Sequence, residues 1–280
     1  MHKLVRCIRF SINPFLSDDS QGYNSFASRP AGEGLSIFFE LWVGLCGEIE
    51  MQTGFVVNVA DIDKCVRSSI VPAFGNYIRD RYRTGRHIGL GNIFELLNSA
   101  RETLAEKFRP VMPGELSLKL NPFRKVAIDC GLSSKSNDAR PQEAGETKMV
   151  YLSEKFEFAA THKLWNDEFS QQRNLEVFGN CANPTGHGHN YALEVTVKKD
   201  IGKSDFCIGE FEKVVHNELI TRIDHKNLNV DVPEFNNVNP TVENIATYAW
   251  QKLAGKFGDV KLNCVTVWET DKTYCSYYGR

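Results

Sequence analysis

Two stretches of the chain alternate apolar with polar residues in the manner of strands, and they align with each other without a gap. They read GEGLSIFFELWV at 32–43 and GHGHNYALEVTV at 186–197. The N-terminal MHKLVRCIRFSINPF and the later FEFAATHKLW are also strand-like, and each half ends in further strand-like sequence. We therefore predict two strands at the start and two at the end of each half.

Apolar residues recur at helical spacing between these strands, twice in each half. Pro240 suits the first turn of the last such segment, with Asn239 or Thr241 as its N-cap. The four predicted helices cover residues 61–71, 91–108, 209–223 and 241–257.

The shared order of strand, strand, helix, helix, strand, strand predicts two α+β domains, each with helices packed on one face of an antiparallel sheet. A duplication is the economical explanation. The sequence at 130–148 is rich in Ser, Gly and charged residues and is the best linker candidate. We therefore expect domains at 1–129 and 149–280, joined by residues 130–148.

Composition narrows the class of protein. The 280 residues carry a formal net charge of -2, which gives no reason to expect a nucleic-acid or membrane-surface partner. No apolar run is long enough to span a bilayer, and the first residues lack the apolar region and cleavage site of a secretory signal. We expect a cytoplasmic protein whose eight cysteines, none in a CxxC pair, stay reduced.

Two histidines, His187 and His189, lie two residues apart where GHGHNY enters a predicted strand. Residues two apart in a strand point to the same face, so the two imidazoles converge. Gly186 and Gly188 beside them remove side chains that would crowd a metal ion. A single HxH pair also fits a turn with ordinary histidines, which on its own is the simpler interpretation.

A third histidine, His162, changes the balance between these interpretations. It lies in FEFAATHKLW, and pairing of that strand with residues 187–197 would bring three imidazoles together. Three histidines with an open fourth position are the ligand set of a catalytic zinc, although other transition metals also bind imidazoles. Such a zinc acts as a Lewis acid toward a substrate oxygen.

Further polar positions are candidates for catalysis or binding. Cys181 lies just before the HxH pair, and a thiolate near a zinc ion can serve as a base or nucleophile. Asp224 and His225 form an acid–imidazole pair able to activate such a thiol, although similar pairs are common on surfaces. Glu269 follows an apolar strand and is either an acceptor for paired N–H donors of a flat heterocycle or a solvated strand end.

Five motifs, FAATH, FGNCANPTGHGHNY, IDHKNL, PTVENIATYAW and VWETD, stand in the order and spacing of 6-pyruvoyl-tetrahydropterin synthases. Residues 150–280 resemble this family nearly end to end. The resemblance implies the tunnelling fold (T-fold), whose domains assemble into β-barrel rings. It also implies a zinc-dependent carbon–oxygen lyase that converts 7,8-dihydroneopterin triphosphate to 6-pyruvoyltetrahydropterin and triphosphate, as in tetrahydrobiopterin biosynthesis.

The resemblance further implies a role for each candidate residue. In the family's pattern, three histidines bind zinc, a cysteine abstracts a proton, an Asp–His pair completes the proton relay, and a glutamate anchors the pterin ring. The zinc positions match His162, His187 and His189. The other positions match Cys181, Asp224, His225 and Glu269, with Thr241 in a segment that helps to hold the ring.

Two other functions stay open at this point. The related 6-carboxytetrahydropterin synthases of queuosine biosynthesis share the fold and most of the site, but usually place three residues between the cysteine and HGH. Five residues separate Cys181 from His187, which favours the pyruvoyl branch. The second alternative is a non-catalytic pterin-binding or scaffold module, against which the intact set of candidate residues argues.

The first half departs from the family's pattern. The alignment puts Glu33 and Leu35 in the places of His187 and His189, and FSINP puts Pro14 in the place of His162. Because proline and leucine cannot ligate zinc, we expect this half to be metal-free and retained for assembly.

The basic stretch YIRDRYRTGRH at 77–87 is interpreted as a solvated loop. The alternative is a repurposed anion-binding pocket. Its members would be Glu33, Arg79, Arg81, Arg83, Arg86 and His87.

Active sites in the family lie between subunits, which sharpens the expectation about assembly. A site at a junction of a first and a second half would lack half of its residues. We therefore expect catalytic domains to pair with one another, in a homotrimer that imitates the hexamer of single-domain relatives.

Overall fold

The computed structural model describes residues 1–15, 35–129, 149–201 and 206–280. They form two compact units. Unit 1 comprises Met1–Leu152 with Asp200–Phe206, and unit 2 comprises Ser153–Lys199 with Cys207–Arg280. The predicted linker at 130–148 lies outside the described residues, so the predicted domain boundaries stay a prediction.

The described residues of unit 1 form four strands that pair antiparallel in sequential order. In the first strand, Ile8, Phe10 and Ile12 are buried, because alternate positions of a strand face the same side of the sheet. The strands are β1 (His2–Ile12), β2 (Ile37–Gly47), β3 (Met112–Lys119) and β4 (Arg124–Asp129).

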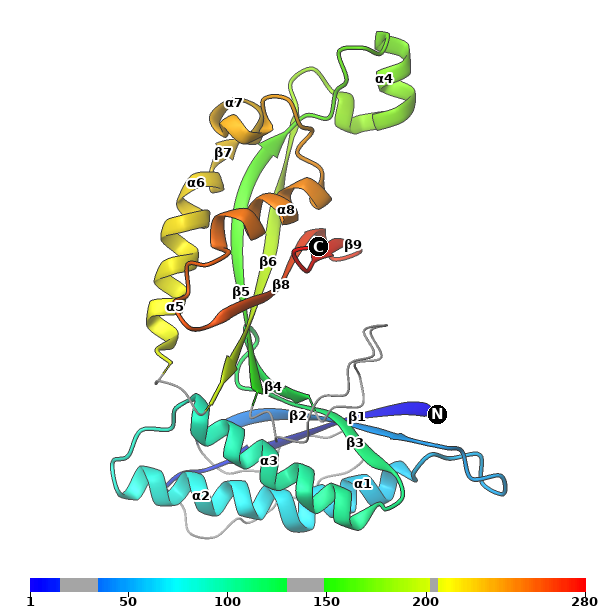
Figure 1. Ribbon diagram of the computed structural model, residues 1–280, viewed down its shortest axis with the longest axis vertical. Coiled ribbons are helices and arrows are strands. Elements are labelled where there is room, and N and C mark those ends of the chain that lie inside the picture. Colours follow the sequence, from blue (N-terminus) through cyan, green and yellow to red (C-terminus); the bar gives the residue numbers. More distant parts are fainter. Residues whose placement is uncertain (16–34, 130–148, 202–205) are drawn as a thin grey trace. The chain divides into compact units, whose positions relative to one another are not determined.

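Helices cover one face of these strands, as Figure 1 shows. The first two contact β1, and the third contacts β3 and β4. Leu97 and Leu104 of the third helix are fully buried, and Phe74 meets Phe10 edge-on with ring centroids 6.1 Å apart. The helices are α1 (Val59–Cys65), α2 (Val71–Arg83) and α3 (Leu90–Lys107), with a π-helical segment at Val66–Ile70.

Unit 2 contains a second set of strands. The strand β6 pairs antiparallel with β8, which pairs antiparallel with β9, while β5 borders β6 on its other side and the short β7 joins β5 in parallel. In β6, Tyr191, Leu193 and Val195 are buried and the residues between them are not. The strands are β5 (Met149–His162), β6 (His187–Asp200), β7 (Lys226–Asn227), β8 (Lys261–Thr270) and β9 (Thr273–Tyr277).

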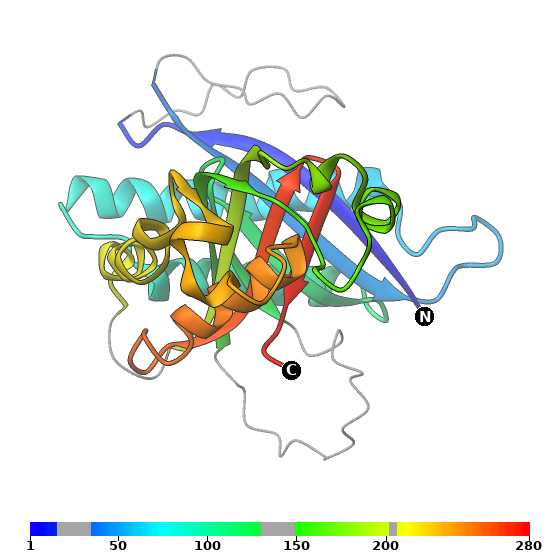
Figure 2. The same ribbon diagram turned by 90° about the horizontal axis from the view of Figure 1, so that it is seen from above.

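The long helices of unit 2 also pack on the strands. The helix α8 contacts β8 and β9, and Figure 2 shows it lying across these two strands. Phe211 of α5 meets Phe156 of β5 with ring centroids 6.1 Å apart. The helices are α4 (Gln171–Phe178), α5 (Ile208–Val215), α6 (Thr221–Ile223), α7 (Leu228–Asp231) and α8 (Val242–Leu253).

A π-helical segment interrupts the first long helical run in both units. It spans Val66–Ile70 between α1 and α2, and His216–Ile220 between α5 and α6. Both runs bury every fourth residue. The residues buried at this spacing are Ile62, Val66, Ile70, Phe74 and Ile78 in unit 1, and Phe211, Val215, Leu219 and Ile223 in unit 2.

The predicted α+β class is confirmed, because antiparallel strands and helices follow one another in the predicted order. No helix among the described residues is long and apolar enough to cross a membrane. For the last helix, the predicted N-cap at Thr241 is confirmed, whereas the placement of Pro240 in the first turn is wrong. Thr241 is the N-cap of α8 and its hydroxyl accepts a hydrogen bond from the N–H of Asn244, so Pro240 precedes the helix.

The prediction of a solvated basic loop at 77–87 is wrong for its first seven residues, which form the end of α2. Within them Ile78 continues the buried stripe and Arg79 is only 7% exposed. The guanidinium of Arg81 donates a hydrogen bond to the hydroxyl of Tyr77 one helical turn earlier, at 2.9 Å. The many charged residues in this stretch outweighed Ile78, the apolar residue that continues the helical spacing.

The structure describes two of the three positions that align with the histidines. Leu35 is 90% exposed, and Pro14 is buried two residues beyond the end of β1. Glu33 lies outside the described residues, so the alternative of an anion pocket that includes it stays a prediction. Neither described residue offers a donor atom to a metal ion.

We predict that replacing Leu97 by alanine lowers the free energy of unfolding by about 2–5 kcal/mol, because it leaves a cavity in the fully buried core of unit 1. Chemical denaturation followed by circular dichroism measures this change. The matched control is Leu35→Ala, the same substitution at an exposed position, which should change stability by less than about 0.5 kcal/mol. Equal effects of the two substitutions would contradict the assignment of this core.

Candidate active site

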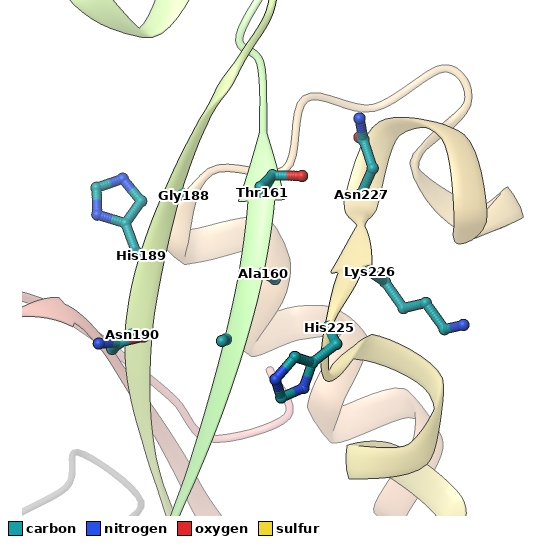
Figure 3. A pocket seen from close by; sticks show the side chains of 9 residues that line it. Ala160, Thr161, Gly188, His189, Asn190, His225, Lys226 and Asn227 are labelled. Atoms are coloured by element: carbon teal, nitrogen blue, oxygen red, sulfur yellow. The ribbon is translucent and has the colours of Figure 1, made fainter.

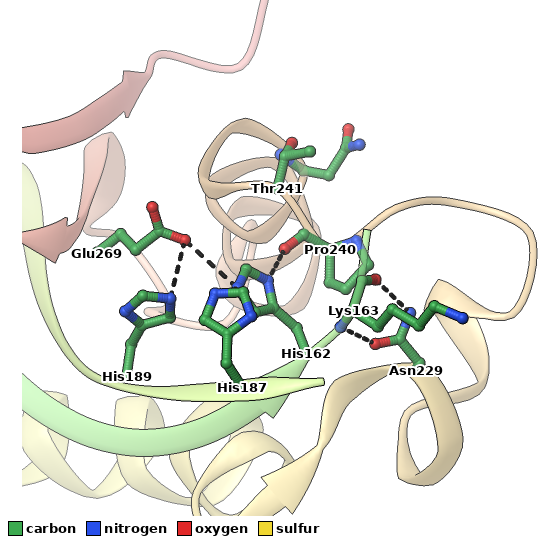
Figure 4. Close-up of polar contacts among 9 residues, drawn as sticks. His162, Lys163, His187, His189, Asn229, Pro240, Thr241 and Glu269 are labelled. Carbon is green, nitrogen blue, oxygen red and sulfur yellow. Dashed lines mark hydrogen bonds and ion pairs between the residues drawn. The ribbon is translucent and has the colours of Figure 1, made fainter. Parts of the chain in front are cut away.

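The structure brings His162, His187 and His189 together at the meeting point of β5 and β6, as Figure 4 shows. The Nε2 atoms of His162 and His187 are 3.1 Å apart. The ring centroid of His189 is 4.7 Å from that of His187 and 5.2 Å from that of His162. One donor atom from each ring lies within 4.8 Å of the other two.

Strand geometry produces this convergence. His187 and His189 occupy alternate positions at the start of β6, and His162 ends β5. Gly186 has a positive φ of 70°, and a Cβ there would lie 2.8 Å from the carbonyl oxygen of His162. A Cβ on Gly188 would meet Thr161 rather than the imidazoles. The expectation that these glycines make room for a metal is therefore wrong, since they allow the backbones to approach.

A backbone carbonyl fixes the orientation of His162. Its Nδ1 lies 2.7 Å from the carbonyl oxygen of Pro240, which can only accept a hydrogen bond, so Nδ1 carries the proton and Nε2 presents its lone pair. Burial lowers the pKa of His162 and that of His189, which favours the neutral imidazoles that metal ions require.

The donor set fits a zinc ion. Among the described residues, the buried atoms His187 Nδ1 and His189 Nε2 have no hydrogen-bond partner. Buried ring nitrogens without partners are costly unless a ligand uses them. Three imidazoles, one of them held by a hydrogen bond to a backbone carbonyl, are the pattern of a zinc site that keeps one position open.

Glu269, near the end of β8, directs its carboxylate at the histidines. Its Oε1 lies 3.5 Å from Nε2 of His162 and 3.5 Å from Nε2 of His189. The two interpretations of this residue were a ligand acceptor and a solvated strand end. Its side chain is only 21% exposed and points into the cluster, so it is not a solvated strand end.

Cys181 lies in a short 3-10 segment, Gly179–Ala182, that follows α4. Its carbonyl accepts a hydrogen bond from the N–H of Leu164 at 2.9 Å, which ties it to the chain leaving β5. Burial and the negative charge of Glu269 both raise the pKa of the Cys181 thiol. The contacts of a single chain therefore disfavour the thiolate.

Asparagine side chains hold the segment that links the histidines to Cys181. Asn229 and Asn239 accept hydrogen bonds from the backbone N–H groups of Lys163 and Trp165, at 2.7 and 2.9 Å. Asn174, which is fully buried, accepts from the N–H of Asn166 and donates to the carbonyls around it. The sequence analysis missed these residues, because their partners lie up to 74 positions away.

Asp224 and His225 form a turn against the edge of β5. The carboxylate of Asp224 accepts hydrogen bonds from the N–H of Ala159 and from Nδ1 of His225, both at 2.9 Å, and the first of these holds its pKa below the usual range. His225 has a φ of 56°, an uncommon conformation for a residue with a side chain. Its ring is 82% exposed.

A pocket of about 410 Å³ adjoins this turn and is drawn in Figure 3. Thr161, Gly188 and Asn190 line it from the strand positions that alternate with the histidines. In Figure 3, β6 and β5 stand between the ring of His189 and the ring of His225. No hydrogen bond joins His225 to Cys181 among the described residues, so one chain does not assemble the expected relay.

Thr241 and Tyr191 complete the surroundings of the histidines. The hydroxyl of Thr241, a residue expected to help hold a ligand, caps α8 next to Pro240. Tyr191 was missed by the sequence analysis, although it follows His189 at the same alternating spacing in HGHNY. Its ring contacts His189 edge-on, with centroids 5.5 Å apart. Because alternate residues of a strand share a face, the spacing of His187 and His189 extends to Tyr191 and could have identified it.

Known proteins match the half of the chain that holds this site. The family model described as 6-pyruvoyl tetrahydropterin synthase matches residues 151–280, which include all eight candidate residues. The human 6-pyruvoyl tetrahydrobiopterin synthase is 36% identical over 138 residues, covering 48% of this chain and 95% of that relative. The 6-carboxy-5,6,7,8-tetrahydropterin synthase of Aquifex aeolicus is 29% identical over 158 residues, covering 45% of this chain and 96% of that relative.

Among solved structures, the 6-pyruvoyl tetrahydropterin synthase of Caenorhabditis elegans has 30% sequence identity to the chain and a TM-score of 0.44. The alignment covers 47% of this chain and 96% of that one.

We predict that the dialysed protein retains about one zinc ion per chain and that His162→Ala abolishes this, because the ion loses its most buried ligand. Metal content measured by mass spectrometry tests this expectation. The control is His216→Ala, which removes an exposed histidine outside the cluster and should leave the metal content unchanged. Retention of zinc by the His162 variant would contradict the assignment.

Proposed function

Since this chain belongs to the 6-pyruvoyl tetrahydropterin synthase family, we propose that its second half converts 7,8-dihydroneopterin triphosphate to 6-pyruvoyltetrahydropterin and triphosphate. The observation that carries this proposal is the convergence of three imidazoles and one carboxylate within the matched range. The reaction is an elimination with an internal redox rearrangement, so it needs no nicotinamide.

His162, His187 and His189 are the proposed ligands of a zinc ion, which would supply Lewis-acid chemistry toward the side-chain hydroxyls of the substrate. The carbonyl of Pro240 keeps the His162 ring in the tautomer and orientation that this role needs. The lowered pKa values of His162 and His189 preserve their lone pairs at neutral pH.

Glu269 is the proposed anchor of the pterin ring. A carboxylate accepts two N–H donors from a flat heterocycle, and such charge-assisted pairs fix both position and plane. In the structure this carboxylate lies between two imidazoles without a strong hydrogen bond to either, at 3.5 Å. It is therefore available to a ligand, and the neighbouring cap residue Thr241 belongs to the segment proposed to hold the ring.

Cys181 is the proposed base that removes a proton from the substrate side chain. Its raised pKa shows that the surroundings within one chain do not activate it. The ring of His225 is exposed, and in Figure 3 it lies across β5 and β6 from the ring of His189. We therefore place the relay between two copies, with Cys181 of one chain served by Asp224 and His225 of the other.

Unit 1 is proposed to serve assembly rather than chemistry. Its described residues offer no donor at the positions that align with His162 and His189, yet its strands and helices keep the order of unit 2. A homotrimer in which second halves pair with second halves would supply the shared relay.

We predict that the zinc-loaded protein releases triphosphate and a 6-pyruvoyl product from 7,8-dihydroneopterin triphosphate, and that Cys181→Ala lowers kcat at least about 100-fold because the base is lost. Product mass spectrometry and steady-state kinetics test this. The control Cys207→Ala removes an exposed thiol outside the site and should leave kcat unchanged.

Other products would separate the alternatives. A 6-carboxy product with acetaldehyde would contradict the pyruvoyl assignment and favour the branch to which the Aquifex relative belongs. Full turnover by the Cys181 variant would overturn the base assignment. Binding of the pterin without turnover by the wild-type protein would contradict the enzymatic proposal and support a binding module.

We predict that two inactive variants, Cys181→Ala and His225→Ala, regain activity when co-assembled. In an equal random mixture about one quarter of shared sites would pair an intact Cys181 with an intact His225, and in the purified mixed trimers about one third would do so. Co-expression with two affinity tags, followed by sequential purification and assay, measures the recovery. Mixtures of each variant with itself are the controls.

A mixed oligomer that stays inactive would contradict the shared relay, because a site formed within one chain cannot be restored by exchange. A stable monomer in multi-angle light scattering would contradict the proposed homotrimer.

A further inference from the structure

Tyr191 lies beside the histidines on β6, two residues beyond His189 and on the same face. Its ring stacks on Phe158 of β5 with centroids 4.8 Å apart and planes 9° from parallel. The rings of His189 and His162 meet it at steep angles, with centroids at 5.5 and 6.2 Å. The stacked phenylalanine leaves the tyrosine ring little freedom to turn.

The hydroxyl of Tyr191 is buried and has no hydrogen-bond partner among the described residues. The whole residue is only 1% exposed. A buried hydroxyl without a partner costs free energy, and a phenylalanine would keep the stacking without that cost. Packing therefore explains the ring of Tyr191 but not its oxygen.

The ring of Tyr191 lies among the side chains of the candidate active site, because it contacts the rings of His189 and His162. Ala192 of β6 pairs with Trp268 of β8, so Tyr191 and Glu269 are each the chain neighbour of a residue in this pair. The carboxylate of Glu269 has nevertheless turned to the imidazoles of His162 and His189 and makes no hydrogen bond with the hydroxyl. A ligand oxygen would supply the acceptor that the described residues lack.

The phenol is suited to donate. A phenolic hydroxyl is a hydrogen-bond donor. Because stacking already holds the ring in place, the Tyr191 side chain loses little conformational entropy when its hydroxyl binds a ligand oxygen.

We propose that Tyr191 is a substrate-binding residue whose hydroxyl donates a hydrogen bond to a side-chain hydroxyl oxygen of the pterin substrate, at the place where the three histidines converge. This inference rests on the proposed function and deepens it by assigning recognition of the hydroxylated side chain to Tyr191. Glu269 then recognises the ring, and Tyr191 distinguishes a hydroxylated side chain from an apolar one.

The test compares two ligands and two proteins. Zinc-loaded wild type and Tyr191→Phe are titrated with 7,8-dihydroneopterin, which carries side-chain hydroxyls, and with 6-methyl-7,8-dihydropterin, which carries none. We expect the substitution to weaken binding of the first ligand about tenfold and to leave binding of the second unchanged. Isothermal titration calorimetry measures both dissociation constants without turnover.

Two controls separate recognition from structural damage. The metal-free Tyr191→Phe protein should melt at or above the temperature of the wild type, because it loses a buried hydroxyl that lacks a partner. Tyr274→Phe removes a hydroxyl from a tyrosine that is 61% exposed, and it should bind both pterins as the wild type does.

The outcomes distinguish this inference from the proposed function. Equal losses for both ligands, or no loss for either, in a wild type that binds both would overturn the role of Tyr191 alone. A lower melting temperature for metal-free Tyr191→Phe would also overturn it, because the hydroxyl would then have a structural partner. A wild type that binds neither pterin would overturn the proposed function together with this inference.

Discussion

The period of two along β6 is the constraint on which the site and the core of unit 2 both depend. His187 and His189 stand on the same face of the strand as Leu193 and Val195, which are fully buried. The apolar residues can only be buried if the strand keeps this face inward, and that choice also turns the imidazoles toward His162. A slip of one residue in the register of this strand would turn the core residues and the two histidines to the opposite face at the same time.

Much of this arrangement follows from local patterns in the sequence. Alternation and helical spacing predicted the order of elements, since burial of one face is a local property of a strand or helix. The HxH spacing predicted that His187 and His189 share a face, and the strand-like sequence around His162 predicted its neighbour. The basic end of α2 was mistaken for a loop, because a run of charge outweighed one apolar position, Ile78.

The supporting contacts could not be predicted, because they join segments that are distant in the sequence. The carbonyl of Pro240 meets His162 across 78 positions, and the side chain of Asn229 meets Lys163 across 66. No pattern within one segment encodes such a pairing. The sequence also does not show whether a buried hydroxyl has a hydrogen-bond partner. Tyr191 fits the pattern of an ordinary core residue, and only the structure shows that its oxygen has no partner among the described residues.

The two π-helical segments have a consequence for how the helices lie on their strands. Four residues of an α-helix turn by about 40° more than a full circle, so a stripe of every fourth residue would wind around the helix. Both runs bury every fourth residue over three or more steps, and both contain a wider π turn that takes up this excess. Such turns often mark functional sites, yet unit 1 has one where no zinc ligand aligns. The π turn therefore keeps the buried residues of each helical run in one straight row against the strands. This role is independent of the chemistry that only unit 2 is proposed to carry.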